Sequence, residues 1–258
     1  MKEDPPHREL IRLESVTVAS PAGRPVLAGV HWTLRAGEFH IVGGLNWSGK
    51  TDWLATAAAL QNPACGRQHL FGVDLADASR SDFAGLRRRI GFVFEQDGRL
   101  FTDLNVAENL ALPLSYHRNC GIDDVLPDVR RVLRACSLDG CATTRIPELG
   151  RALRRRVALA RALAMEPEVL LIDTPLGNSD PVHCRWWVDF LDRLHRDAIP
   201  GLKTPAAIVV TVEDFRAWLG GGRAFYLLEN GCLQHLGDES GLVQSPAPAA
   251  REMLTGPA

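Results

Sequence analysis

The residues with the clearest chemical meaning are two glycines, a lysine and a hydroxyl residue, spaced as Gly44-x-x-x-x-Gly49-Lys50-Thr51. In this pattern, backbone amides of the turn wrap phosphate groups, the lysine reaches the outer phosphates and the hydroxyl binds Mg²⁺. The residues predicted to contact a nucleotide here are Gly44, Leu45, Asn46, Trp47, Ser48, Gly49, Lys50, Thr51 and Asp52. The spacing therefore predicts a phosphate-binding loop (P-loop) that holds the phosphates of a nucleotide together with Mg²⁺.

The segments on either side of this loop have the character that such a site needs. Phe39–Val42 is a short apolar run that predicts a buried strand, and 52–60 predicts a helix. A glycine-rich turn between a strand and a helix presents free amides and the positive end of the helix dipole to an anion. The flanks therefore support phosphate binding over an ordinary turn.

The other predicted elements indicate a sheet with helices between its strands. The runs 169–172 and 206–210 are continuously apolar, as is typical of strands buried on both faces of a parallel sheet. A helix is predicted over 123–137, where the apolar residues recur at helical spacing. Further predictions are early strands over 10–18 and 26–34, a hairpin over 225–233 with an Asn230-Gly231 turn, and a linker-like tail over 245–250.

Composition excludes several classes of protein. The 258 residues carry a net charge of −2, which argues against a nucleic-acid-binding protein. The arginine clusters 87–89 and 154–156 are interpreted, for most of their side chains, as solvated helix faces. No apolar run reaches the roughly 18 residues of a membrane span, and the first residues do not form a secretory signal. The six scattered cysteines predict free thiols in a reducing compartment and no metal site.

Several segments follow the P-loop in a characteristic order. They are Val157-Ala158-Leu159-Ala160-Arg161-Ala162-Leu163, Pro167, Val169 to Asp173, Pro175, Asp180-Pro181, Val209-Val210-Thr211 and the Asn230-Gly231 hairpin. In order and spacing, nearly the whole chain resembles the ATP-binding subunit of ABC transporters.

This resemblance implies an α/β fold of the P-loop NTPase, ABC-cassette type. It implies a mostly parallel core sheet, an N-terminal antiparallel β subdomain and a helical subdomain at about 92–165, within a cassette over 8–240 that a tail over 241–258 follows. It also implies two partners, a membrane permease and a second cassette, which is either another copy or a different chain. The location implied is cytoplasmic, at the inner face of the cell membrane.

A narrower resemblance concerns two segments. Leu100–Asn109 and Pro248–Pro257 are similar to the corresponding parts of the Mla/Mce-type ATPases, which drive phospholipid movement between bacterial membranes. The resemblance implies a lipid-related transport system, and chance similarity in a short loop and a tail is the alternative.

The resemblance assigns Mg²⁺ to Thr51 and Asp173, but catalytic residues of the family are missing. Thr174 stands where the family has its catalytic Glu, and Val212 stands where it has the switch His. A threonine hydroxyl is no base at neutral pH, and valine cannot donate a hydrogen bond to a phosphate. Glu213 and Asp214 follow Val212, and we expect their side chains to point away from the site.

The remaining family motifs are altered as well. The signature loop reads Leu149-Gly150-Arg151-Ala152-Leu153, so the usual Ser and both glycines are lost, although Arg151 could reach a phosphate. Either Glu95 or Gln96 is the Q-loop residue, and the D-loop is kept only in part, as Asn178-Ser179-Asp180. Trp47 replaces a family Gly, where it either strains the loop or packs over the nucleotide. No aromatic residue for adenine stacking occurs at 18–20, so affinity is expected to be modest.

Together these features predict a subunit that binds Mg-ATP in a transport system, with weak or absent hydrolysis. The alternative is a catalytically dead cassette that serves as a regulatory or scaffold protein. A different P-loop enzyme, such as a small-molecule kinase, would not explain the segment 159–180.

Overall fold

The computed structural model describes residues 8–95, 99–177 and 179–256. The strands are β1 (Glu9–Ala19), β2 (Pro25–Arg35), β3 (Phe39–Gly43), β4 (Cys65–Leu70), β5 (Val73–Asp74), β6 (Ile90–Val93), β7 (Val169–Ile172), β8 (Ala207–Val212), β9 (Ala224–Glu229) and β10 (Cys232–Gly237). The α-helices are α1 (Lys50–Ala57), α2 (Arg80–Arg87), α3 (Val106–Arg118), α4 (Ile122–Ala135), α5 (Arg151–Ala164), α6 (Pro181–His195), α7 (Glu239–Val243) and α8 (Pro248–Thr255).

The larger sheet determines where the functional site lies. Its strand order is β10-β9-β3-β8-β7-β6, and all neighbouring pairs are parallel except the edge pair β9–β10. Every residue of β3, β7 and β8 is buried, which explains their continuous apolar sequences. Because Gly43 pairs with Val212, and Ile172 with Val210, the loops that follow these three strands meet at one edge of the sheet.

The smaller sheet is antiparallel, with the order β2-β1-β4-β5. Its apolar face shares one core with α1 and one face of the larger sheet, and Trp32 of β2 packs edge-on against Trp53 of α1 with ring centroids 5.0 Å apart. This packing fixes the direction of α1, whose first turn carries Lys50 and Thr51.

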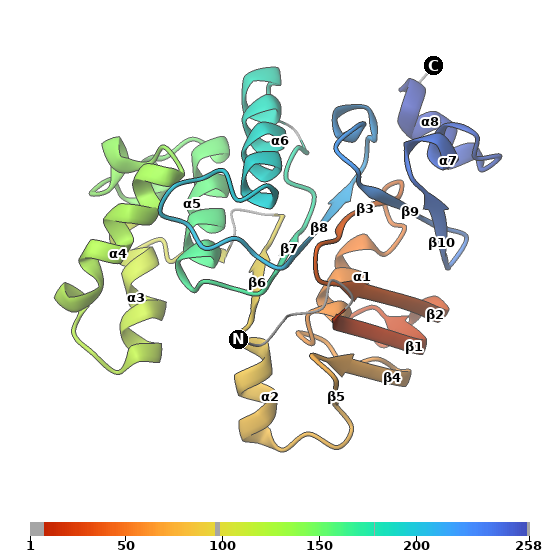
Figure 1. Ribbon diagram of the computed structural model, residues 1–258, viewed down its shortest axis with the longest axis horizontal. Coiled ribbons are helices and arrows are strands. Elements are labelled where there is room, and N and C mark those ends of the chain that lie inside the picture. The colour runs from red at the N-terminus through yellow and green to blue at the C-terminus, as the bar shows by residue number, and fades with distance from the viewer. Residues whose placement is uncertain (1–7, 96–98, 178, 257–258) are drawn as a thin grey trace.

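The helices α3, α4 and α5 gather on one side of the molecule, and the smaller sheet lies on the other (Figure 1). The apolar stripe predicted for α4 is buried, including Val125, Val129, Val132 and Leu133. The predicted α/β fold class, with a mostly parallel sheet, an antiparallel sheet and a group of helices, is confirmed. No helix in the described ranges is both long and apolar enough to cross a membrane.

Two local predictions can be compared directly with the structure. The Asn230-Gly231 turn has positive φ at both residues, 51° and 74°, as a type I′ turn requires, so the hairpin prediction is confirmed. The helix predicted over 52–60 instead spans 50–57. It begins earlier because Gly49 caps it, and it ends before Ala59, whose φ is +53°.

The interpretation of 245–250 as a linker-like segment is wrong. Residues from Pro248 onward form α8, and Ala249, Ala250 and Met253 of this helix are buried in the main core. The backbone carbonyl of Met253 accepts a hydrogen bond from the amide of Phe215 at 3.0 Å. Alanine is a strong helix former, and Pro248 suits the first helical turn, so the Pro/Ala composition favours a helix here. The division into a cassette over 8–240 and a tail over 241–258 stays a prediction.

Replacing Met253 with alanine is expected to lower the free energy of unfolding by about 2–5 kcal/mol, because the side chain is buried and its loss leaves a cavity. Urea denaturation measures the change. Glu252→Ala, at the exposed neighbouring position of the same helix, is the control and should change stability by less than about 0.5 kcal/mol. Equal stability of the two variants would show that α8 does not contribute to the core.

Candidate phosphate-binding site

The loop between β3 and α1 is shaped by Gly49, which caps the helix. Gly49 has φ of +89°, and an added Cβ would lie only 2.4 Å from Cγ1 of Val26, so glycine is required on both counts. No side chain caps α1. The amides of its first turn therefore have no partner inside the helix, and they carry the positive end of its dipole.

A cleft of about 690 Å³ lies in front of this helix end. It is lined by Ser20, Pro21, Val26, Asn46, Trp47, Ser48, Gly49, Lys50, Thr51, Asp52, Glu95, Thr174 and Glu213. The volume is in the range of small-molecule sites, about 300–1,000 Å³. The structure thus brings most of the predicted contact residues together in one cleft, while Gln96 lies outside the described residues.

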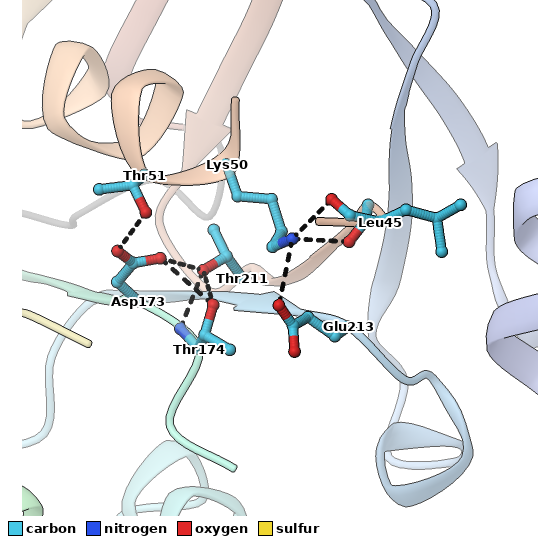
Figure 2. Close-up of polar contacts among 8 residues, drawn as sticks. Leu45, Lys50, Thr51, Asp173, Thr174, Thr211 and Glu213 are labelled. Carbon is cyan, nitrogen blue, oxygen red and sulfur yellow. Dashed lines mark hydrogen bonds and ion pairs between the residues drawn. The ribbon is translucent and has the colours of Figure 1, made fainter. Parts of the chain in front are cut away.

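Lys50 is held in place at the floor of the cleft. Its Nζ donates hydrogen bonds to the backbone carbonyls of Gly44, at 2.7 Å, and Leu45, at 3.0 Å, and lies 3.8 Å from Oε1 of Glu213 (Figure 2). Burial lowers the pKa of Lys50, and the charge of Glu213 acts in the opposite direction. The predicted residues Gly44 and Leu45 therefore contribute by orienting the lysine.

Asp173 connects the loop after β7 with α1 and β8. One oxygen of its carboxylate accepts a hydrogen bond from Oγ1 of Thr51 at 2.7 Å, and the other accepts one from Oγ1 of Thr211, also at 2.7 Å. Thr211 in turn accepts a hydrogen bond from the backbone amide of Thr174 at 3.0 Å. Thr51 and Asp173 thus lie together, as the magnesium assignment requires, and their oxygens are of the type that Mg²⁺ binds.

The residues present fit a phosphate group accompanied by Mg²⁺. Oγ of Ser48 is buried and has no hydrogen-bond partner within the described part of the chain. Such an orphaned hydroxyl is costly in a packed structure unless a ligand satisfies it. Together with the free amides of α1 and the ammonium of Lys50, it completes a set of donors around one space.

Carboxylates surround the lysine. Burial, followed by the charges of Asp173 and Glu213, raises the pKa of Glu95, and burial followed by the charge of Asp173 raises the pKa of Asp52. Among the described residues that line the cleft, Lys50 is the one cation, and the carboxylates are those of Asp52, Glu95 and Glu213. This excess of negative charge favours a phosphate ligand that arrives with a divalent cation.

Trp47 does not fill the phosphate cradle. Its side chain is 100% exposed, and its backbone is left-handed, with φ of +66°. The left-handed backbone supports local strain at this residue, because a bulky side chain in this conformation costs about 1–2 kcal/mol. Packing of Trp47 over the nucleotide stays a prediction.

Replacing Trp47 with glycine is expected to raise the free energy of unfolding by up to about 1 kcal/mol, because glycine adopts the left-handed conformation without penalty. The indole is fully exposed, so its removal costs little packing. The midpoint of urea denaturation measures the effect. Trp47→Ala is the control, since it removes the same ring but keeps the Cβ. Equal stability of the two variants would contradict the strain.

Thr174 and Val212, which the sequence resemblance places at the positions of the catalytic Glu and the switch His, lie beside this network. Thr174 is 4% exposed and left-handed, with φ of +42°, and Val212 is the buried last residue of β8. The expectation that Glu213 points away is wrong. Strand alternation ends with β8 at Val212, so it does not control the direction of the next side chain, and Glu213 faces Lys50. Asp214 does turn away, and it pairs with Arg216.

The segment 149–153, which the sequence resemblance places at the signature loop, leads into α5. Gly150 is the N-cap residue without a side chain to bond, and Arg151 is the exposed first residue of the helix. The interpretation of 154–156 as a solvated face is wrong for Arg155, which is 3% exposed. Its guanidinium donates hydrogen bonds to the carbonyls of Pro175 and Gly177. Arg155 thereby fixes the loop that carries Thr174.

Sequence reasoning missed three residues of the site: Thr211, Arg155 and Glu213. Thr211 is the one polar residue of β8, a strand whose six residues are all buried, and that feature could have drawn attention to it. For Glu213 and Arg155 no comparable signal exists, because their roles depend on loops that follow β8 and β7.

Known proteins resemble this chain in both sequence and structure. The family described as ABC transporter matches residues 27–177. The chain is 36% identical over 176 residues to the lipoprotein-releasing system ATP-binding protein LolD of Anaeromyxobacter dehalogenans. This alignment covers 68% of this chain and 73% of LolD. It is 29% identical over 234 residues to the intermembrane phospholipid transport system ATP-binding protein MlaF of Escherichia coli. This alignment covers 90% of this chain and 84% of MlaF.

Among solved structures, the bacterial ABC transporter cassette MJ0796 in its dimeric form aligns with a TM-score of 0.75 and 27% identity, over 87% of this chain and 96% of the other. CbiO1 from Clostridium perfringens aligns with a TM-score of 0.76 over 92% of this chain and 94% of CbiO1. Because the two sequences are only 20% identical, this similarity supports the fold alone. The matched region includes the loop, the lysine and Asp173 described above. The chain therefore belongs to the ABC transporter family, as a nucleotide-binding subunit of an ABC transport system.

Proposed function

We propose that this subunit binds Mg-ATP and hydrolyses it slowly or not at all. One observation carries the proposal: the donors that would hold a triphosphate are assembled around Lys50. The sequence resemblance adds that Thr174 and Val212 stand where the family has its catalytic Glu and its switch His. The cleft thus has groups that suit phosphate binding, whereas the side chains of Thr174 and Val212 cannot act as the general base or as the donor to a phosphate.

In the bound state, the first-turn amides of α1, Oγ of Ser48 and the ammonium of Lys50 would contact the phosphates. Thr51 and Asp173 would hold Mg²⁺, which supplies charge neutralisation at the outer phosphates. Their existing hydrogen bond of 2.7 Å keeps both oxygens in place before a ligand arrives.

Hydrolysis needs a group that orients and deprotonates the attacking water. General-base catalysis contributes typically about 10²- to 10⁴-fold, and a threonine hydroxyl cannot supply it. Thr174 is also occupied, because its backbone amide and its hydroxyl both lie within hydrogen-bonding distance of Thr211. Slow turnover follows from this arrangement.

The test measures binding and phosphate release with the same preparation of the full chain. Calorimetry should detect Mg-ATP binding, while phosphate release stays at the level of a Lys50→Ala sample. Release well above that level would contradict slow hydrolysis, and no heat of binding at millimolar Mg-ATP would contradict nucleotide binding.

We further propose that the transport system is lipid-related and that a membrane permease docks beside α2 and α3. The names of LolD and MlaF support the first point. A groove of about 460 Å³ supports the second, since it combines apolar residues such as Phe83, Pro113 and Met165 with the cations Arg87 and Arg88. Such a groove suits an amphipathic helix with acidic residues. Co-expression with a permease encoded nearby, followed by co-purification from detergent, tests the second point, and phospholipid bound specifically to the purified complex tests the first.

A further inference from the structure

Glu213 lies where the cleft meets the end of β8. It is the first residue after the strand, it lines the cleft, and its carboxylate is 3.8 Å from Nζ of Lys50 (Figure 2). The side chain is 41% exposed, so the carboxylate borders the open space of the cleft.

A lysine ammonium has three N–H donors and no acceptor. Two of these donors are used by the carbonyls of Gly44 and Leu45, and the remaining side of the ammonium faces Glu213. Lys50 is 7% exposed and is held by backbone atoms, so it cannot turn toward a different anion without losing these bonds. Without a ligand, the anion beside Lys50 is therefore the protein's own carboxylate.

We propose that Glu213 holds the place beside Lys50 that the terminal phosphate of a nucleoside triphosphate needs, so that this cleft prefers nucleoside diphosphates. The inference rests on the proposed nucleotide binding and adds a ligand preference to it.

The preference follows from where each phosphate would lie. In a P-loop the amides cradle the inner phosphates, and the lysine reaches between the second and the third. A diphosphate can thus use the amides of α1 and the near side of Lys50. A third phosphate extends toward the end of β8 and meets the carboxylate of Glu213, with Glu95 lining the same cleft. Like charges a few ångströms apart in a partly buried site repel strongly.

Asp173 cannot be the cause of the same preference. Both of its oxygens accept hydrogen bonds, from Thr51 and Thr211, and it is 1% exposed. Its oxygens therefore remain at the metal position whichever nucleotide binds. Glu213 is instead the carboxylate that pairs with Lys50 itself, and its side chain is partly exposed in the cleft.

The experiment compares the dissociation constants of Mg-ATP and Mg-ADP by calorimetry for the unmodified chain, Glu213→Gln and Asp214→Asn. The unmodified chain should bind Mg-ADP more tightly. Glu213→Gln should lower the dissociation constant of Mg-ATP about tenfold and that of Mg-ADP less than about threefold. The reason is that only the third phosphate lies close to the charge that the substitution removes. Asp214→Asn removes a neighbouring carboxylate that pairs with Arg216, and it should leave the ratio unchanged.

Three results would overturn the inference while leaving nucleotide binding intact. The first is that the unmodified chain binds Mg-ATP more tightly than Mg-ADP. The second is that Glu213→Gln increases the affinity for both nucleotides equally, and the third is that Glu213→Gln lowers the affinity for Mg-ATP. Failure of both nucleotides to bind to all three proteins would instead overturn the proposed function, and this inference with it. Thermal unfolding of each variant checks that the substitutions leave the chain folded.

Discussion

Replacing Lys50 with alanine is expected to weaken Mg-ATP binding about 100-fold. The ammonium is the one cationic side chain among the described residues that line the cleft, and a charged hydrogen bond of this kind contributes about 1.5–3 kcal/mol. Its loss also leaves the carboxylate of Glu213 without the charge that offsets it, so the variant cleft repels phosphate more strongly. Calorimetric titration with Mg-ATP measures the change.

The matched control for this variant is Lys203→Ala, which removes an exposed lysine and should leave affinity unchanged. Because Lys50 is buried, thermal unfolding must accompany the titration, so that weak binding is not mistaken for loss of structure. If Lys50→Ala is folded and binds Mg-ATP as the unmodified chain does, phosphate does not lie against α1 and the proposed site is wrong.

Replacing Thr174 with glutamate is expected to raise the rate of phosphate release about 100-fold, the lower end of the usual contribution of a general base. The lower end applies because Val212 and the altered segment 149–153 remain as they are. The backbone at this position is fixed by Thr211 and by Arg155, which contacts the following loop, so the new side chain would start from an ordered position. Single-turnover phosphate release with Mg-ATP measures the rate.

Thr174→Gln is the control for this substitution, because it has the same shape as glutamate but cannot accept a proton. An equal increase in both variants would mean that size at position 174, and not basicity, limits the rate. No increase in either variant, with Mg-ATP affinity retained, would show that the missing base is not what makes hydrolysis slow.

The sequence predicts those parts of the molecule whose causes are local. The strand β3, the loop and the presence of a helix after it follow from apolar runs and glycine spacing, and the Asn230-Gly231 turn follows from the backbone freedom of its two residues. The place of Asp173 is equally local, since it comes directly after the buried strand β7. These features need only the periodicity of a single element and its ends.

The parts that could not be predicted depend on contacts between distant segments. Arg155 has the sequence context of an exposed helix residue, and it is buried because carbonyls of the loop after β7 accept its hydrogen bonds. The helix α8 is held against the protein because the side chain of Met253 is buried in the main core, a contact with distant segments that the local sequence does not reveal. Glu213 faces Lys50 because β8 ends one residue earlier, and the position of a strand end is among the least certain features of any sequence prediction.

The indole of Trp47 gives this protein a built-in optical probe. Trp32, Trp53, Trp187 and Trp218 are buried, and Trp186 is partly covered where it stacks on Phe190. Trp47 alone among the six tryptophans is fully open to water, and it lies at the mouth of the cleft. Its emission and its access to a soluble quencher therefore report whether another surface covers this mouth, with no dye attached to the chain.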